Sequence, residues 1–213
     1  MTAAAAAGAA AAGAAAGWLA APVAARYRGP LAPRAGIGVA ALTGAVLAAL
    51  AVRLGTRPDL GAFAYLAVIG VQLAVIDTAV KRLPNAITLP SYPIGLTLLA
   101  AAAPFTPGGA ARLAHALAGM TVLWAVYFVQ HALAPRAMGG GDVKLAGVLG
   151  LYLGWLGEAA WVTGVVAGLL YGGLYSATWL LLGRAGRKDE LPFGPFMLAG
   201  ALTGILFGGW FAR

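Results

Sequence analysis

The sequence has no cysteine and only two histidines among its 213 residues. The lack of cysteine excludes disulfide bridges, a thiol nucleophile and any zinc site built on cysteine. His115 and His131 fall near the two ends of one apolar run. Sixteen residues of helix separate them by about 24 Å, so these two side chains cannot share a metal ion.

Charge is also scarce, because only 9% of the residues are charged while 62% are hydrophobic. A soluble domain carries roughly 25% charged residues, so most of this surface does not face water. Apolar runs longer than about 18 residues recur along the chain, which is typical of membrane-spanning helices. The composition therefore predicts an all-α, polytopic membrane protein that forms a single domain over residues 1–213.

About eight transmembrane helices are expected. They cover residues 3–25, 35–52, 60–77, 86–103, 113–134, 143–157, 159–182 and 191–212. Pro84 is expected to end the third helix, and Pro90 and Pro93 are expected to break the start of the fourth. The first run consists almost entirely of alanine and glycine. An alternative for it is a low-complexity tail that does not insert into the bilayer.

The net charge of +8 could suggest a nucleic-acid partner, but the basic residues are scattered in short loops between apolar runs. That pattern indicates membrane topology and no nucleic acid. With eight helices, ten of the fourteen basic residues share one side: Arg26, Arg28, Arg34, Lys81, Arg82, Arg136, Lys144, Arg184, Arg187 and Lys188. The positive-inside rule places this side in the cytoplasm and both termini outside.

Six acidic residues remain to be explained. Four fall in predicted loops, where a solvated charge is a sufficient explanation: Asp59, Glu158, Asp189 and Glu190. Asp77 and Asp142 instead adjoin long apolar runs, on the same predicted side. An aspartate at a bilayer centre costs about 2.5–3.5 kcal/mol, so an acid among apolar helices indicates a functional site. Two neighbouring carboxylates share one proton, and such a pair can activate water and polarise a peptide carbonyl.

Three glycines, Gly139, Gly140 and Gly141, directly precede Asp142. They could adopt positive φ and let the backbone approach an extended substrate strand. Alternatively, they only terminate the fifth helix, and Asp142 is the N-cap of the sixth. Asp77 could likewise be an end-of-helix charge in contact with lipid headgroups.

Three segments together resemble the type IV prepilin peptidase family. They are Asp77-x-x-x-x-Arg82-Leu83-Pro84-Asn85, then Gly139-Gly140-Gly141-Asp142-Val143-Lys144-Leu145, and finally Leu191-Pro192-Phe193-Gly194-Pro195-Phe196. The similarity covers residues 60–212 in order and spacing. It implies an intramembrane aspartic endopeptidase of the Gly-x-Gly-Asp type, with Asp77 and Asp142 as the catalytic pair, without metal or cofactor.

The resemblance also implies further site residues and a substrate. Residues that would bind substrate or shape the site are Gly139, Gly140, Gly141, Lys144, Pro84, Asn85, Phe193, Gly194 and Pro195. Lys144 would hold a carboxylate in its charged form, meet the substrate, or only anchor the chain at the cytoplasmic face. The partner would be a prepilin-like precursor with a basic leader and an apolar helix, cleaved at the cytoplasmic face of the inner membrane.

The sequence departs from the family after the first apolar run. Many members carry a cytoplasmic insertion there with paired Cys-x-x-Cys motifs, and they also methylate the new pilin terminus with S-adenosylmethionine. Here the corresponding loop is the short region 26–34, and cysteine is absent. We therefore expect no separate cytoplasmic methyltransferase or zinc domain, and a peptidase without N-methyltransferase activity.

Three alternatives stay open. A presenilin-like or signal-peptide-peptidase-like protease shares Gly-x-Gly-Asp, but it has a Tyr-Asp pair and a Pro-Ala-Leu motif, whereas this chain has Ile76-Asp77 and no Pro-Ala-Leu. A proton-coupled transporter could use the two acids as a relay, although no repeated halves are visible. A non-catalytic scaffold would leave the paired acids unexplained.

Overall fold

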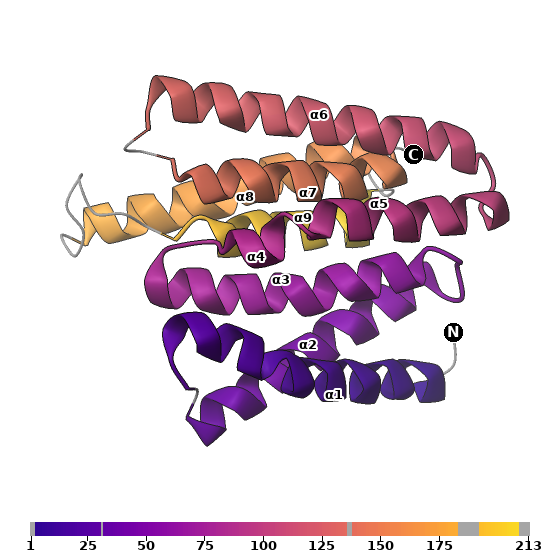
Figure 1. Cartoon of the computed structure of the whole chain (residues 1–213), viewed down its shortest axis with the longest axis horizontal. Helices are drawn as coiled ribbons and strands as arrows, with labels where there is room; N and C mark the ends of the chain where they lie inside the picture. Colours follow the sequence, from indigo (N-terminus) through magenta and orange to yellow (C-terminus); the bar gives the residue numbers. More distant parts are fainter. Residues whose placement is uncertain (1–2, 31, 136–137, 183–191, 209–213) are drawn as a thin grey trace.

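All the regular secondary structure in the described part of the chain is helical (Figure 1). This computed structural model describes residues 3–30, 32–135, 138–182 and 192–208. The elements are α1 (Ala3–Arg28), α2 (Pro33–Leu54), α3 (Leu60–Val80), α4 (Asn85–Thr88), α5 (Ser91–Ala102), the short 3₁₀ helix η1 (Ala103–Phe105), α6 (Gly109–Leu133), α7 (Gly140–Leu156), α8 (Glu158–Leu181) and α9 (Gly194–Phe207).

Six helical segments are long and apolar enough to cross a bilayer: α1, α2, α3, the stretch Asn85–Phe105, α6 and α8. The remaining two, α7 and α9, are shorter, with 17 and 14 residues. The expectation of an all-α polytopic membrane protein is confirmed. The expected number of about eight spans counts these six together with α7 and α9.

Helix α7 lies at the centre of the bundle. Twelve of its 17 residues are buried, on every side of the helix. Helix α6 covers one side, and α4, α5, α8 and α9 pack on the others. Phe63 of α3 reaches Tyr152 of α7 with its ring, and α1 and α2 lie beyond α3 (Figure 1). A helix that is apolar all round and enclosed by other helices has no face for lipid. This explains how a helix of about 26 Å can lie inside the bundle without spanning a full bilayer.

Glycines let the backbones of neighbouring helices touch. A Cβ added to Gly200 of α9 would overlap the backbone of Gly168 in α8, and one on Gly204 would lie 2.8 Å from the Gly164 Cα. Helices α6 and α7 approach in the same way at Gly119 and Gly150. The close packing expected from the glycine repeats of α8 and α9 is therefore present.

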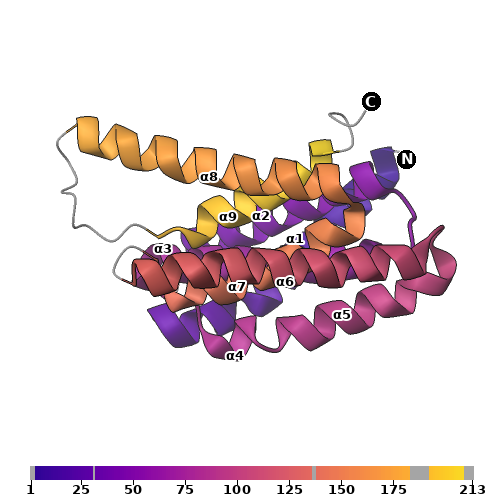
Figure 2. The same ribbon diagram turned by 90° about the horizontal axis from the view of Figure 1, so that it is seen from above.

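The helix termini and loops gather at the two ends of the bundle. The α3–α4 loop and the starts of α7 and α9 share one end, at the left of Figures 1 and 2, whereas α1 begins and α9 ends at the other.

The expected break in the fourth span is confirmed, because α4 stops at Thr88 and α5 starts at Ser91. The expectation that Pro84 ends α3 was wrong. Lys81, in a left-handed conformation, ends α3, and Pro84 is instead the N-cap of α4.

Asp59 corrects the expectation of a solvated loop charge. Its side chain is fully buried at the start of α3. Arg57 donates from Nε to Oδ1 at 3.0 Å and from Nη2 to Oδ2 at 2.5 Å, and Trp155 Nε1 donates to Oδ2 at 2.7 Å. A buried carboxylate is tolerated when its oxygens are satisfied in this way. Asp59 thus joins the start of α3 to the end of the central helix α7.

Replacing Asp59→Asn should lower the free energy of unfolding by about 2–3 kcal/mol, because an amide NH₂ would then face donors of Arg57 and Trp155. Thermal unfolding of the purified protein in detergent measures this loss. Glu158→Gln is the matched control, since Glu158 is exposed at the same end. We expect the control to change stability by less than about 0.5 kcal/mol. Equal stability of both variants would contradict the structural role assigned to Asp59.

Candidate active site

Asp77 lies in the last turn of α3 and is only 4% exposed. Its Oδ2 accepts a hydrogen bond from the backbone N–H of Gly194 at 2.9 Å. Gly194 is the first residue of α9, where backbone N–H groups have no partner within the helix. The start of the short helix α9 therefore holds the carboxylate at the end of α3. Lys81 closes α3 behind it, adopting φ 51° and donating its N–H to the Asp77 carbonyl at 2.7 Å.

Asp142 lies in the first turn of α7 and is partly buried. Its Oδ2 accepts from the backbone N–H of Gly139 at 3.2 Å, and Gly139 is the N-cap residue of α7. Asp142 thus caps the helix from the third helical position and is not itself the N-cap, which was one alternative from the sequence. Its second carboxylate oxygen has no recorded hydrogen bond within the described residues.

The structure brings these two carboxylates together. They lie near enough for electrostatic interaction, although 65 positions separate them in the sequence. Leu83 of the α3–α4 loop is buried at the same place. A Cβ on Gly141 would lie 2.9 Å from the Leu83 Cβ, and one on Gly194 would lie 3.4 Å from its Cδ2 and 2.8 Å from Asp77 Oδ2. The starts of α7 and α9 therefore close around Leu83 because both lack side chains there.

The glycines before Asp142 do not act through positive φ, so that expectation was wrong. Among the described residues, the glycines with positive φ are elsewhere: Gly29, Gly55, Gly108 and Gly157. Gly139 is extended, with φ −71°. Gly141 is required by its contact with Leu83, whereas a Cβ on Gly140 would meet only His131, at 3.9 Å. His131 itself contacts the Met138 carbonyl through Nδ1 at 2.7 Å and so holds the turn before α7.

Lys144 and Asn85 connect α7 to the α3–α4 loop. Lys144 Nζ donates to Asn85 Oδ1 at 2.7 Å, and the Tyr92 hydroxyl donates to the Lys144 carbonyl at 2.7 Å. Asn85 follows Pro84 as the first residue of α4 and is exposed. In the described structure the Lys144 ammonium thus contacts an amide oxygen, and no ion pair with either aspartate is recorded. The contact between the two residues joins the start of α7 to the loop that carries Leu83.

Tyr127 is a site residue that the sequence did not reveal. It lies in α6, is 4% exposed and lies within electrostatic range of Asp142. Its ring centroid is 6.5 Å from that of Phe193, which precedes Gly194, and Pro195 follows Gly194 in the first turn of α9. A tyrosine in a long apolar helix carries no local signal, because its proximity to Asp142 arises only when α6 packs against α7.

The arrangement supports acid–base chemistry on water and a carbonyl group. Repulsion between two nearby carboxylates favours a state in which one of them is protonated, so one can accept a proton from water while the other donates one. Backbone N–H groups at two helix starts fix their positions. Among the described residues, no group of three or more histidine, aspartate or glutamate side chains lies close enough to hold a metal ion.

The sequence comparison agrees with this geometry. Residues 62–209 match the type IV leader peptidase family. The chain belongs to that family. Its match includes α3, α7 and α9, which carry or hold both aspartates. The resemblance noted from the three motifs is confirmed.

Several relatives are named prepilin leader peptidase/N-methyltransferase. The protein from Dickeya chrysanthemi is 36% identical over 149 residues, which is 66% of this chain and 49% of that protein. The protein from Bacillus subtilis is 31% identical over 169 residues, 78% of this chain and 64% of that protein. A protein from Burkholderia pseudomallei is 34% identical over 197 residues, which is 88% of this chain and 56% of that protein. The chain thus spans about half to two-thirds of the length of these relatives. No solved structure matches it significantly.

Gly141→Ala should lower the free energy of unfolding by about 1–3 kcal/mol, because the new methyl group would press on Leu83 and separate α7 from the α3–α4 loop. Thermal unfolding in detergent measures the effect. Gly140→Ala is the matched control: its methyl group has room and alanine favours the helix, so stability should stay equal or rise slightly. If Gly141→Ala is as stable as Gly140→Ala, the close contact does not constrain the site.

Proposed function

We propose that this protein is an intramembrane aspartic endopeptidase that removes the basic leader from type IV pilin-like precursors. The observation that carries the proposal is the buried Asp77 carboxylate, which lies within electrostatic range of Asp142 at one end of an apolar bundle. The names of the relatives state a prepilin leader peptidase. Asp77 and Asp142 match the positions of the two aspartates in the family motifs.

The mechanism follows from one proton shared by the two carboxylates. The carboxylate without the proton removes a proton from water, and the resulting hydroxide adds to the carbonyl carbon of the scissile peptide. The protonated partner donates to the carbonyl oxygen, which gives a neutral tetrahedral gem-diol. Collapse of this intermediate breaks the C–N bond, and the leaving amine receives a proton from the pair. The N–H groups of Gly194 and Gly139 keep the carboxylates oriented throughout.

The low polarity around the pair strengthens every electrostatic interaction in the site. Asp77 is buried by α9 and Leu83, whereas Asp142 and Asn85 are accessible at the end of the bundle. Water and an extended peptide segment can therefore approach from the Asp142 side. Lys144, Pro84 and Asn85 would border this approach, and Phe193 and Pro195 would border it from α9.

We also propose that this end of the bundle faces the cytoplasm of an inner-membrane protein, with both termini outside. Six basic residues described by the structure lie in helix ends or loops at the aspartate end: Arg26, Arg28, Arg34, Lys81, Arg82 and Lys144. Three lie at the opposite end: Arg53, Arg57 and Arg112. This asymmetry supports a cytoplasmic active site. Arg136 and the charged loop 184–190 lie outside the described residues.

The proton-coupled transporter finds little support in the structure. Both carboxylates lie at one end of the bundle, whereas coupling sites of transporters lie near the middle of the bilayer. The family match also favours a prepilin-type protease over a presenilin-like one.

Asp77→Asn and Asp142→Asn should each abolish cleavage, with a loss of at least about 10³-fold, because neither half of the pair can exchange protons alone. The assay uses purified protein in lipid nanodiscs and a precursor with a basic leader, a glycine and a long apolar helix. Mass spectrometry of the products locates the cut.

Thr78→Val is the matched control, since Thr78 is the next residue of α3, is exposed and bonds only to its own helix through Ala74. This variant should cleave normally. Unfolding temperatures confirm that all variants are folded. Cleavage by either folded asparagine variant would refute the paired-aspartate mechanism.

We further propose that the chain cleaves without methylating its product. The sequence has no cysteine, and the loop between α1 and α2 is too short for an inserted domain. Incubation with precursor and S-adenosylmethionine should give a product whose new N-terminus has no added 14 Da. A methylated product would overturn this expectation while leaving the peptidase proposal intact.

A further inference from the structure

A basic pocket lies at the end of the bundle opposite the aspartates. Its volume is about 350 Å³, and it is lined by three arginines from separate segments: Arg53 at the end of α2, Arg57 in the α2–α3 loop and Arg112 in the first turn of α6. The start of α8 completes the wall, with Glu158. The three described arginines of this end therefore converge on one place.

Each of these arginines is held by part of its guanidinium group and keeps other donors accessible. Arg57 uses Nε and Nη2 on Asp59, and Arg53 donates from Nε to the Leu206 carbonyl at 2.8 Å. Arg112 donates from Nε to the Pro107 carbonyl at 3.1 Å and from Nη1 to the Trp155 carbonyl at 3.4 Å, which leaves Nη2 open. Within the described residues the recorded ion pair is that of Arg57 with Asp59, so Arg53 and Arg112 have no carboxylate partner. Fixed guanidinium groups with open donors are well suited to a phosphate group.

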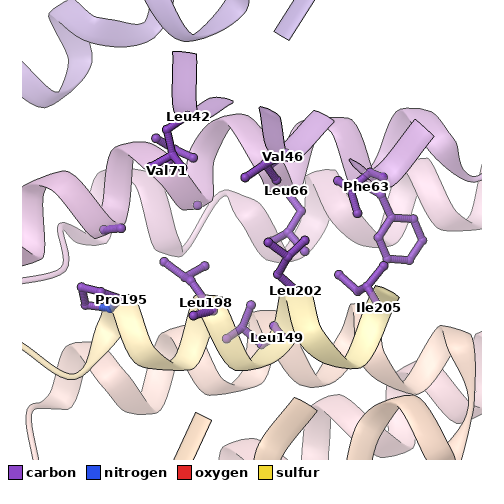
Figure 3. A pocket seen from close by; sticks show the side chains of 16 residues that line it. Leu42, Val46, Phe63, Leu66, Val71, Leu149, Pro195, Leu198, Leu202 and Ile205 are labelled. Atoms are coloured by element: carbon purple, nitrogen blue, oxygen red, sulfur yellow. The ribbon is translucent and has the colours of Figure 1, made fainter. Parts of the chain in front are cut away.

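A second cavity, an apolar slot, is shown in Figure 3. It has a volume of about 270 Å³ and lies between α2, α3 and α9, where side chains such as Leu66, Leu198 and Leu202 point into it. Ile205 lines both the slot and the basic pocket. On α2, Leu50 of the slot lies one helical turn from Arg53. The basic pocket and the slot are therefore contiguous at α9 and α2.

The dimensions of the slot select its occupant. Along α3 it extends from Phe63 to Ala74, which corresponds to about 16 Å at the helical rise. A helix of that length with its side chains would fill well over about 1,000 Å³, far more than the 270 Å³ of the slot. A helix with its side chains is about 10–12 Å wide and cannot enter, whereas a single extended hydrocarbon chain can.

We infer that the basic pocket and the slot together bind one anionic glycerophospholipid, with its phosphate at Arg53 and Arg112 and one acyl chain between α3 and α9. The start of α8 adds backbone N–H groups beside the phosphate, where a helix N-terminus favours an anion. The acyl chain runs from the headgroup end toward Ala74, one turn before Asp77, and ends against Pro195. The lipid thereby fills the interface of the helices that position the Asp77 carboxylate.

Native mass spectrometry of the purified full chain in detergent tests this inference by titration with lipids and phosphate. We expect one long-chain phosphatidylglycerol to bind at least tenfold more tightly than phosphatidylcholine of the same chain length. Inorganic phosphate should compete poorly, because it lacks the acyl chain. Equal binding of the two lipids would overturn the inference, because the site would then not select for charge. Displacement of the lipid by phosphate alone at similar concentration would also overturn it, because the site would then hold an adventitious ion only.

Variants separate the two halves of the site. Arg53→Gln combined with Arg112→Gln should weaken phosphatidylglycerol binding by tenfold or more, since each basic residue near an anionic headgroup contributes about fivefold. The control with equal charge loss is Arg26→Gln combined with Arg34→Gln, which lie outside the pocket at the other end. Unchanged binding in the Arg53/Arg112 variant, or an equal loss in the control, would contradict the site.

Ala199→Phe should obstruct the slot, because Ala199 lines it and is otherwise exposed. Binding of long-chain phosphatidylglycerol should fall at least fivefold, while that of the dihexanoyl form stays unchanged. Leu170→Phe, at an exposed position of α8, is the control. If the long-chain lipid binds Ala199→Phe as it binds the original protein, the acyl chain lies elsewhere. All these measurements record binding and not peptide cleavage, so their outcome is independent of the proposed enzymatic function.

Discussion

The hydrogen bond from the Gly194 N–H to Asp77 is the interaction on which the site depends. An apolar bundle has few donors for a carboxylate, because the backbone N–H groups within its helices already pair with their own carbonyls. The first turn of a helix is the exception. Both aspartates use it, since Asp77 bonds to the start of α9 and Asp142 to the residue that caps α7. Two helix starts at one end of the bundle therefore make a paired carboxylate site possible.

The position of those helix starts follows from contacts far from the carboxylates. Gly164, Gly168 and Gly200 let α8 and α9 touch along their backbones, which fixes the height at which α9 begins. Gly150 and Gly119 do the same for α7 and α6. At the far end, Asp59 ties α3 to α7 through Trp155. The helices that meet at the site are thus fixed along their whole length, which is the rigidity that a catalytic pair requires.

The sequence predicted the spans and the two aspartates because these signals are local or compositional. A run of apolar residues indicates a helix in a bilayer, and an acid beside such runs is costly enough to require a reason. The burial of Asp59 was missed because its partner Trp155 lies 96 positions away in the sequence. Tyr127 was missed for the same reason. Of the three glycines before Asp142, Gly141 is required for a reason that the sequence did not give, because Leu83 lies against it.

Charged side chains at the two ends of the bundle are stabilised by polar groups of opposite sign. Acids at one end are held by backbone N–H groups of helix starts, and arginines at the other are held by carbonyls of helix ends and by one buried carboxylate. Helix dipoles favour both arrangements, because N-termini attract anions and C-termini attract cations. Asp77 is enclosed and Asp142 is partly buried, whereas Arg53 is exposed. Enclosure perturbs proton equilibria and suits catalysis, while open arginine donors suit a phosphate that stays bound. One apolar fold can therefore hold the proposed catalytic pair and the proposed lipid site because its helix ends, and not its helix faces, carry the charge.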